Sequence, residues 1–374
     1  MKLFVRVLIA LLEVATATYS LSAQQTVVDS GRSRSSPRGW NLYLEEDLFY
    51  RPRNEDRNYT GGIGIQFTTG SPRSPQYLLL YGVNRLTRAD RLHLGRQVDV
   101  SSGMLTLTAF TPDSLRAVDI IPDDRPYASL LAWTAKRLSV ALDERSSWRT
   151  EATLGVLGLH LARNGQRYIH KSSRAGSGKP TPYDPKGWSH QVSDGGEPTV
   201  LYTLGYDAVL IDPPRKTTGR LTQKRLFQAT YGWQALAGYY TEVSGSLGAR
   251  LGVLRTDFWE FKTNPMGGTT KAMRGEFPLD AFLFGAVRPR LIGYNALLQG
   301  QFRDTDLRVP ANDITRLVTE FDVGGEIGVN IKSHRYAATV VYPAGRTKEF
   351  RGPRSRTHTW ASVFFTVQPL RPVR

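Results

Sequence analysis

Apolar and polar residues alternate with a period of two along most of the chain from Trp40 onward. The clearest stretch is 317–330, which separates into an apolar face (Thr319, Phe321, Val323, Ile327, Val329) and a polar face (Glu320, Asp322, Gly324, Glu326, Gly328, Asn330). An amphipathic helix would not separate these sets, because its apolar positions recur at three and four. The ranges 200–210 and 241–253 repeat the alternation. The pattern therefore predicts β-strands.

The polar faces of these strands carry Glu, Asp, Asn, Arg and Gly, which are unusual in the packed interior of a soluble sandwich. They are typical of a barrel whose outside meets lipid and whose lumen is polar. About twelve such segments are present, near 40–50, 59–69, 98–111, 126–139, 148–160, 198–211, 225–237, 240–255, 279–291, 315–330, 334–343 and 357–367. We therefore predict an all-β fold, an antiparallel transmembrane β-barrel of about 12 strands, with short helical segments in outer loops.

The ends of the chain predict its processing. Met1, Lys2 and Arg6 precede a mostly apolar run and small residues up to Ala23, which is typical of a secretory signal peptide over 1–23. A buried N-terminal helix is the alternative. We expect a flexible lead over 24–39, the barrel over 40–367 and a short tail over 368–374. With a periplasmic N-terminus, the outer connections are 51–58, 112–125, 161–197, 292–314 and 344–356, while the inner connections 70–97 and 256–278 are unusually long.

Composition narrows the possibilities further. The chain of 374 residues has no cysteine, which excludes disulfides, thiolate metal sites and thiol nucleophiles. Its mature region has no run of about 20 apolar residues, so a helical membrane protein is excluded. The net charge of +16 comes without a basic helix or nucleic-acid motif. Basic outer loops would instead attract the phosphates of lipopolysaccharide, or simply keep the loops soluble.

Four short motifs carry side chains suited to chemistry. They are Glu45-Glu46-Asp47 followed by Leu48-Phe49, Tyr59-Thr60-Gly61-Gly62, Asp124-Arg125-Pro126-Tyr127-Ala128-Ser129, and Gln166 with His170 followed by Gly187-Trp188 and Gln191. Taken singly, each has an ordinary explanation: a solvated strand end, a turn, a salt-bridged turn at the start of the fourth strand, and an exposed loop histidine. A Gly-x-Ser-x-Gly elbow is absent from the sequence, which disfavours a serine hydrolase of that type.

Taken together and in this order, the motifs resemble those of the lipid A 3′-O-deacylase family of outer-membrane barrels. The first is similar to that family's Glu-Asn-Asp-x-Phe, the second to its Tyr-Thr-Asn-Gly and the third to its Asp-Arg-Pro-Tyr-Ala-Gly. Gln166 and His170 match its Gln-x-x-x-His spacing. The resemblance runs from about residue 40 to 255 and more loosely to 367. It implies a twelve-stranded barrel with a calcium-dependent esterase site near the outer rim, acting on the 3′-linked acyloxyacyl group of lipid A.

The resemblance also implies roles for individual residues. His170 would be the general base that activates water. Asp47 and Glu46 would hold calcium, which prefers oxygen ligands and would polarise the ester carbonyl. Thr60 and Gln166 would orient water, ion or base, and a helical turn would place Gln166 and His170 on one face.

Two positions depart from the family pattern. Its Asn is Glu46 here, and its basic residue after the third strand is matched only loosely, by Arg116, our candidate for stabilising the oxyanion. Strand alternation also predicts that Glu46 and Asp47 face opposite sides unless a bulge intervenes.

The sequence thus supports one main hypothesis and its rivals. The main hypothesis is a calcium-assisted lipid A deacylase-like esterase of the bacterial outer membrane, with its site at the outer face. We expect it to be monomeric and to contact lipopolysaccharide and membrane lipids but no nucleic acid. The rivals are a non-catalytic barrel (a pore, a lipid-binding or a structural protein) and an esterase for another membrane lipid. An open lumen would favour a pore, and a plugged lumen with a groove at the outer rim would favour the enzyme.

Overall fold

The computed structural model describes residues 39–46, 58–69, 75–96, 98–172, 185–212, 217–218, 221–222, 225–254, 256–261, 279–332 and 334–369. The expected signal peptide, most of the expected lead and Asp47 lie outside these ranges. In Thr60 and His170 the backbone is described and the side chain is not.

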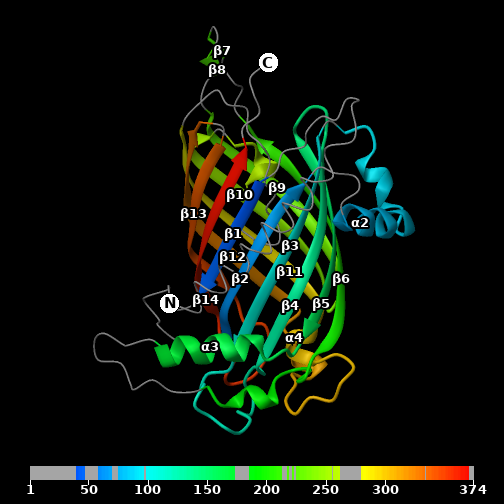
Figure 1. Ribbon diagram of the computed structural model, residues 1–374, viewed down its shortest axis with the longest axis vertical. Helices are drawn as coiled ribbons and strands as arrows, with labels where there is room; N and C mark the ends of the chain where they lie inside the picture. Colours follow the sequence, from blue (N-terminus) through cyan, green and yellow to red (C-terminus); the bar gives the residue numbers. More distant parts are fainter. Residues whose placement is uncertain are drawn as a thin grey trace.

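Twelve of the described strands form a closed antiparallel barrel in the order β1-β14-β13-β12-β11-β10-β9-β6-β5-β4-β3-β2 (Figure 1). They are β1 (Gly39–Glu46), β2 (Asn58–Thr69), β3 (Val98–Thr111), β4 (Ala128–Val140), β5 (Ser146–Leu157), β6 (Glu197–Ile211), β9 (Arg225–Gly238), β10 (Tyr240–Leu254), β11 (Leu279–Asn295), β12 (Leu317–Ile331), β13 (His334–Arg346) and β14 (His358–Pro369). The predicted all-β barrel is confirmed. A separate small hairpin joins β7 (Thr217–Thr218) to β8 (Leu221–Thr222).

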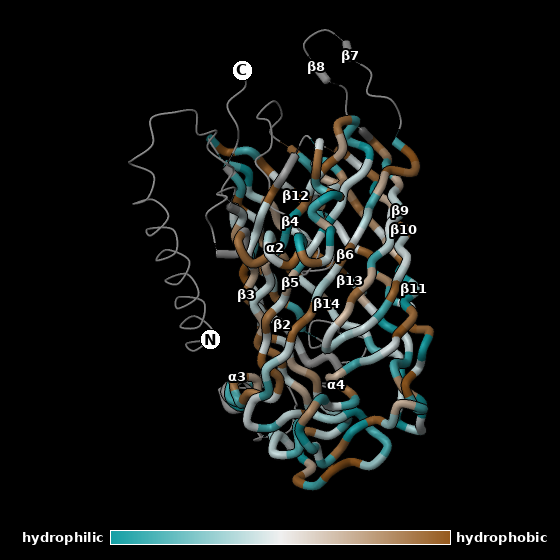
Figure 2. The backbone as a smooth tube through the Cα atoms, turned by 90° about the vertical axis from the view of Figure 1, so that its right-hand side faces the viewer, coloured by the Kyte–Doolittle hydropathy of each residue, from teal (hydrophilic) through white to brown (hydrophobic). Residues whose placement is uncertain are grey.

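The alternation in sequence separates the lumen from the outer wall. On β12, Glu320, Asp322 and Glu326 are buried in the lumen, whereas Val323 and Ile327 are exposed outside. Hydrophobic and hydrophilic segments accordingly intermingle along the strands in Figure 2. We call the exposed outward side chains of β6 and β9–β14 the apolar belt: Val200, Leu210, Leu226, Tyr231, Trp233, Val243, Leu247, Leu251, Leu283, Val287, Leu291, Leu317, Val323, Ile327, Tyr336, Val340 and Phe365. Its composition suits contact with lipid.

The lumen is occupied by ion pairs and apolar side chains. Glu320 lies 2.6 Å from Arg290, 2.8 Å from Arg346 and 3.1 Å from Arg288. Opposite charges thereby meet across β11, β12 and β13, as buried charges require. The short helix α4 (Ala296–Gln299) adds buried Leu297 and Leu298 to the apolar cluster of the lumen. A cavity of ≈ 210 Å³, lined by both charged and apolar side chains, remains beside these residues.

The two ends of the barrel carry different additions. The terminal end, which holds Gly39 and Pro369, also carries α2 (Pro75–Leu86), η4 (Ala89–His93) and η6 (Phe258–Glu260). The opposite end, which we call the α3 end, carries α3 (Leu161–Ser172), η5 (Gly187–His190), α4 and η7 (Ala311–Asp313) (Figure 1). The sequence did not predict α2. Among the described residues, no helix is long and apolar enough to cross a membrane.

Candidate functional site

A row of outward-facing positions at the α3 end crosses β1, β2 and β3. Glu46 pairs with Gly61, and Gly61 pairs with Ala109. Glu45 points the other way, into the lumen, where its Oε1 accepts a hydrogen bond from Ser362 Oγ at 2.8 Å. The predicted alternation therefore places Glu46 on the outer wall.

A β-bulge interrupts this row at Thr60. Tyr59 pairs with Phe110 and Gly61 with Ala109, so Thr60 is an extra residue without an opposite partner on β3. Bulges bend a strand and re-aim its side chains, and they are frequent next to active sites. The sequence raised a bulge only between Glu46 and Asp47, on the preceding strand, and did not predict this one, because no residue type in Tyr59-Thr60-Gly61 requires it.

Gly61 leaves room for the carboxylate of Glu46. A Cβ atom at this position would lie 2.9 Å from Glu46 Oε2 and 2.8 Å from the carbonyl oxygen of Glu45. Any larger residue would displace the Glu46 side chain. The half-buried carboxylate of Glu46 thus lies over Gly61, against the outer wall.

Helix α3 covers the neighbouring part of the same wall. Ala162, on its first turn, is buried in a cluster with Leu115, Tyr127 and Trp188, and the outward-facing Ala109 packs against this cluster. One turn later, the buried Gln166 accepts a hydrogen bond on Oε1 from Trp188 Nε1 at 2.7 Å. The side of α3 that carries Gln166 therefore faces the barrel beside the row of Glu46, Gly61 and Ala109.

The predicted helical turn at Gln166 and His170 is part of α3. Ala162, Gln166 and His170 are spaced by four, so they follow one face of the helix. The described residues therefore bring Glu46 and Gln166 to the same outer wall. Thr60 lies at the bulge of β2 and His170 lies one turn after Gln166 on α3, while Asp47 lies outside the described ranges.

Arg116 lies in the loop between β3 and β4 and is exposed. Its neighbour Leu115 is buried in the cluster beneath α3 and accepts a backbone hydrogen bond from Lys186 at 3.0 Å. Among the described residues, no group of three or more His, Asp or Glu side chains is arranged to hold a metal ion.

The Asp124–Ser129 motif is structural, as predicted. Asp124 accepts hydrogen bonds from the backbone N–H of Asp113 at 2.7 Å and of Arg125 at 2.8 Å. The buried Arg125 lies 3.4 Å from Glu349 and stacks over the Phe110 ring at 4.3 Å. These contacts fix the loop that carries Leu115 and Tyr127 to α3.

Burial and neighbouring charges determine the pKa values of Arg125 and Glu349. Burial lowers the pKa of Arg125, and Glu349 partly opposes that effect. Burial alone would raise the pKa of the Glu349 carboxyl, but Arg346, Arg125 and His358 together lower it to about 2. The pair therefore stays charged at neutral pH, and the loop is held by an ion pair that acid can remove.

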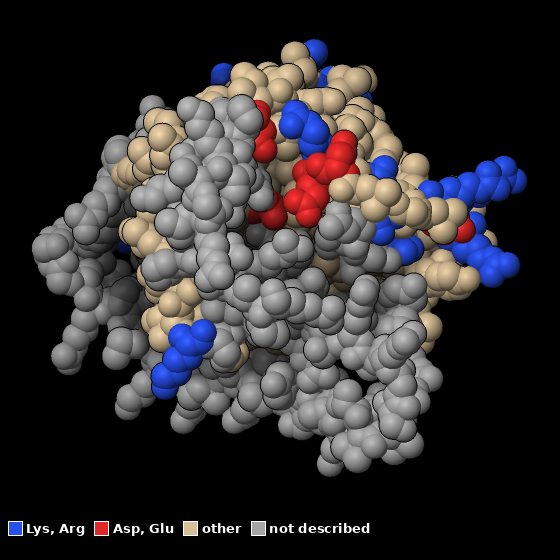
Figure 3. All heavy atoms as spheres, turned by 90° about the horizontal axis from the view of Figure 1, so that it is seen from above, with Lys and Arg blue, Asp and Glu red and all other residues tan. Residues whose placement is uncertain are grey.

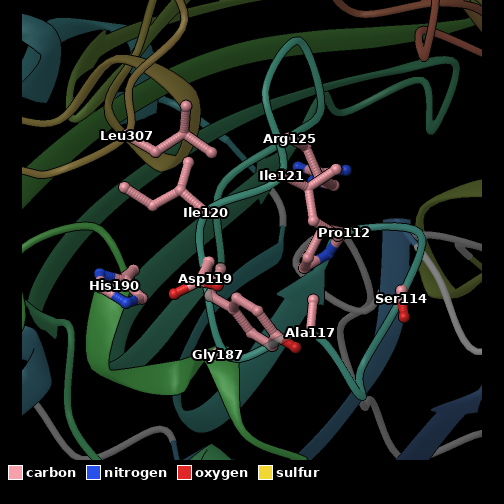
Figure 4. Close-up of a pocket in the computed structure, with 11 residues that line it drawn as sticks. Pro112, Ser114, Ala117, Asp119, Ile120, Ile121, Arg125, Gly187, His190 and Leu307 are labelled. Carbon is pink, nitrogen blue, oxygen red and sulfur yellow. The ribbon is translucent and has the colours of Figure 1, made fainter.

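A small void lies between this loop and η5. Figure 4 shows Arg125, Ile121 and Pro112 on one side of it and His190 and Gly187 on another. Its volume of ≈ 10 Å³ holds about one water molecule and no acyl chain. His190 is also engaged, because its Nδ1 lies 2.6 Å from Asp306. The void is therefore not a substrate site.

Sequence reasoning gave Trp188 and Tyr127 no part in supporting the site. Their rings pack at 4.8 Å under α3, and Trp188 is fully buried. A tryptophan within a polar loop, flanked by Gly187 and Ser189, is the signal that could have identified this anchor.

Comparison with known proteins decides the family. The family model described as outer membrane protein LpxR matches residues 3–368. This chain belongs to the LpxR family. The match spans all twelve barrel strands almost to the end of β14, so the row on β1–β3 and the covering helix both lie within the matched residues.

The solved structure of one LpxR protein agrees with an LpxR-family fold. LpxR from Salmonella typhimurium is similar with a TM-score of 0.62 at 15% identity, covering 88% of this chain and 99% of that one. The beta domain of the Bordetella autotransporter BrkA matches with a TM-score of 0.43 at 11% identity, covering 90% of this chain and 100% of that one. No curated protein matches in sequence. The LpxR-family chain is therefore a bacterial outer-membrane β-barrel, as its sequence predicts.

Proposed function

We propose that this LpxR-family barrel hydrolyses the ester that links the 3′ acyloxyacyl group to lipid A. In this proposal His170 is the general base, and Asp47 and Glu46 hold a calcium ion. The α3 end faces the outside of the cell, where lipid A is found. This orientation is supported by 158–196, the longest connection between two barrel strands, which lies at that end, because extracellular loops of such barrels are usually longer than periplasmic turns.

The observation that carries the proposal is that Glu46 lies on the outer wall of β1, while Gln166 lies on the side of α3 that faces the same wall. A lipid can reach this wall from within the membrane without entering the barrel. The lumen, by contrast, holds the ion pairs of Glu320 and the apolar cluster around α4. A plugged lumen argues against a pore, and a helix-covered outer wall suits an enzyme whose substrate is a membrane lipid.

The residues present suit a calcium ion. Glu46 offers carboxylate oxygens, the ligands that calcium prefers, and the absent side chain of Gly61 keeps space beside Glu46 Oε2. Asp47 follows Glu46 in the sequence and would supply the second carboxylate. When bound, calcium supplies positive charge that polarises the ester carbonyl.

The chain's own groups would carry out the proton transfer. His170, one turn beyond Gln166 on α3, would take a proton from the attacking water and return it to the departing alkoxide. Gln166, whose Oε1 accepts a hydrogen bond from Trp188 Nε1, would orient the base or the water. Thr60, at the bulge of β2, would help to orient the water or the ion. Arg116 would attract the negative charge of substrate or oxyanion from the neighbouring loop.

Mass spectrometry of lipid A tests the proposal. Outer membranes carrying wild type, His170→Ala or the control His334→Ala are incubated with calcium or with a chelator. His334 begins β13 at the terminal end, far from α3, so its loss should not affect activity. We expect the 3′-linked acyloxyacyl mass to be lost with wild type and His334→Ala, only with calcium, and retained with His170→Ala, since a general base contributes about 10²–10⁴-fold.

Two outcomes would contradict the proposal. If lipid A is unchanged although the wild-type barrel is folded and inserted, the non-catalytic alternative is favoured. The sequence feature that supports this alternative is Glu46 in place of the family's Asn. Release of fatty acid from phospholipid instead of lipid A would favour an esterase for another membrane lipid.

A further inference from the structure

The connection between β2 and β3 forms a helical element on the outside of the barrel. Helix α2 packs on β4, β5 and β3, and η4 follows it on the same wall (Figures 1 and 2). Leu80 is buried against Ala135 and Ala152, two small outward-facing residues. We call residues 78–94, from Leu78 of α2 to Leu94 after η4, the wall helix.

Hydrogen bonds fix the wall helix to the barrel. Asn84 is fully buried; its Nδ2 donates to Thr150 Oγ1 at 2.9 Å, and its Oδ1 accepts from Tyr202 OH at 3.1 Å. His93 lies 2.6 Å from Ser139 Oγ and 3.1 Å from Thr150 Oγ1. The wall beneath the helix is therefore polar, unlike the apolar belt, and the helix shields these polar groups from lipid.

The opposite side of the wall helix is both apolar and basic. Leu86 is 86% exposed and Leu94 is 71% exposed, and Leu78 and Tyr81 are exposed beside them. Arg85, Arg88 and Arg91 are exposed too, and among the described residues none of the three forms an ion pair with a carboxylate. In Figure 3, which looks onto the terminal end, Lys and Arg atoms project from the side on which α2 lies.

We propose that the wall helix lies in the membrane interface at the terminal end and binds the headgroups of anionic glycerophospholipids. Exposed leucines interspersed with arginines are typical of helices that bury apolar side chains at the boundary between headgroups and acyl chains. The barrel is an outer-membrane protein, and the wall helix covers β3, β4 and β5, next to β6, where the apolar belt begins. Three guanidinium groups match the phosphates of anionic lipids in charge and geometry. This inference does not depend on the proposed hydrolysis.

Native mass spectrometry of the full chain in detergent tests the charge. The triple variant Arg85→Gln/Arg88→Gln/Arg91→Gln is compared with wild type and with Arg308→Gln/Arg351→Gln/Arg354→Gln, which removes three exposed arginines at the α3 end. The probes are phosphatidylglycerol, phosphatidylcholine and lipid A. A basic residue near an anionic membrane surface contributes about fivefold in binding, so we expect the first variant to bind phosphatidylglycerol at least about tenfold more weakly and the control to change less than about twofold.

Three results of this measurement would overturn the proposal. The first is that the two triple variants bind phosphatidylglycerol equally. The second is that wild type binds phosphatidylglycerol and phosphatidylcholine equally. The third is that replacing Arg85, Arg88 and Arg91 weakens lipid A binding more than phosphatidylglycerol binding.

Spin labelling tests the depth independently. Because the chain has no cysteine, Leu86→Cys can be labelled without any background. The matched control is Leu142→Cys, a 73% exposed leucine in the short β4–β5 turn at the same end. In phosphatidylglycerol-containing vesicles, the label at 86 should be reached by oxygen more readily than by a water-soluble nickel chelate, and the label at 142 should show the reverse. Equal access of the chelate to both labels would contradict the proposal.

Discussion

Two helices of twelve residues pack on the outer wall of this barrel, at opposite ends. Helix α3 is attached through Ala162 and Gln166 to a cluster built from neighbouring loops, with Trp188 at its centre. Helix α2 is attached directly to the strands, through Leu80 and Asn84. The first depends on long loops that must themselves be ordered, and the second only on the barrel. We therefore expect the two ends to respond differently to mutation and to acid.

Trp188→Ala should produce the largest difference in stability between α3 and α2. Removing a fully buried tryptophan leaves a cavity and costs about 3–5 kcal/mol. It also removes the donor to Gln166, so hydrogen exchange should accelerate over 161–172 and remain unchanged over 78–93. Trp188→Phe keeps most of the ring and should lose about 1 kcal/mol, the contribution of the hydrogen bond. Equal acceleration in both helices would mean that α3 and α2 unfold together.

Acid should weaken the α3 end next. The pKa of Glu349 is lowered from its ordinary value of 4.5 to about 2, because Arg346, Arg125 and His358 outweigh its burial. A depressed carboxyl pKa stabilises the fold above pH 4.5, and the contribution, about 3 kcal/mol, is lost as the pH falls toward 2. Denaturant unfolding of the barrel in detergent between pH 6 and pH 2.5 measures this loss.

Glu349→Gln provides the control for the acid effect. It removes the titrating carboxyl, so the variant should be less stable at pH 6 and less dependent on pH below 4.5. A variant with the same pH dependence as wild type would assign the acid sensitivity to another carboxylate.

Asn84→Ala should loosen α2 by a smaller amount. The substitution removes two hydrogen bonds from a buried position, which we expect to cost about 1–3 kcal/mol. Hydrogen exchange over 78–93 should accelerate while that over 161–172 does not. Tyr202→Phe removes the second of these bonds and the hydrogen bond between Tyr202 OH and Thr87 Oγ1, but keeps the bond to Thr150. It should have a smaller effect than Asn84→Ala; an equal effect would mean that Thr150 contributes little.

Glu46→Asn should change stability least. Glu46 is half-buried at the end of β1, so the free energy of unfolding should change by less than about 0.5 kcal/mol. Under our proposal the variant keeps an oxygen ligand but loses a negative charge, so half-maximal lipid A hydrolysis should require at least about fivefold more calcium, since one pair of neighbouring charges contributes about 1 kcal/mol even in water. Activity that appears only in the variant would instead mean that Glu46 blocks the reaction.

The sequence predicted the barrel better than its attachments. Strand positions follow from an alternation that each strand carries in itself, such as Glu320, Asp322 and Glu326 opposite Val323 and Ile327, and these agree with the structure to within a few residues. Even the lumen ion pairs follow this rule, because Arg288 and Arg290 are two apart on β11 and meet the acidic face of β12.

The site was predicted only in part. The four-residue spacing of Gln166 and His170 correctly indicated a helix, but nothing local shows that Trp188 would hold it against Ala109. The bulge at Thr60 follows from the pairing of two strands, not from either strand alone. Helix α2 was not predicted, because its position depends on the barrel surface against which it packs. Leu80 and Asn84 of the helix contact Ala135 and Thr150 of the outer wall, and nothing in the sequence indicates that these small and polar residues are covered by a helix.

A closed barrel cannot shorten, so the separation between α2 and α3 along its axis is fixed. If α2 lies in one membrane interface, it fixes the position of the whole barrel along the membrane normal. The position of α3 relative to the other interface then depends on the thickness of the bilayer. In a thicker bilayer the barrel must tilt or the lipid must thin around it. Membrane thickness would then act on a site at the α3 end without any ligand, by changing how far the outer wall at Glu46 stands above or below the surrounding headgroups.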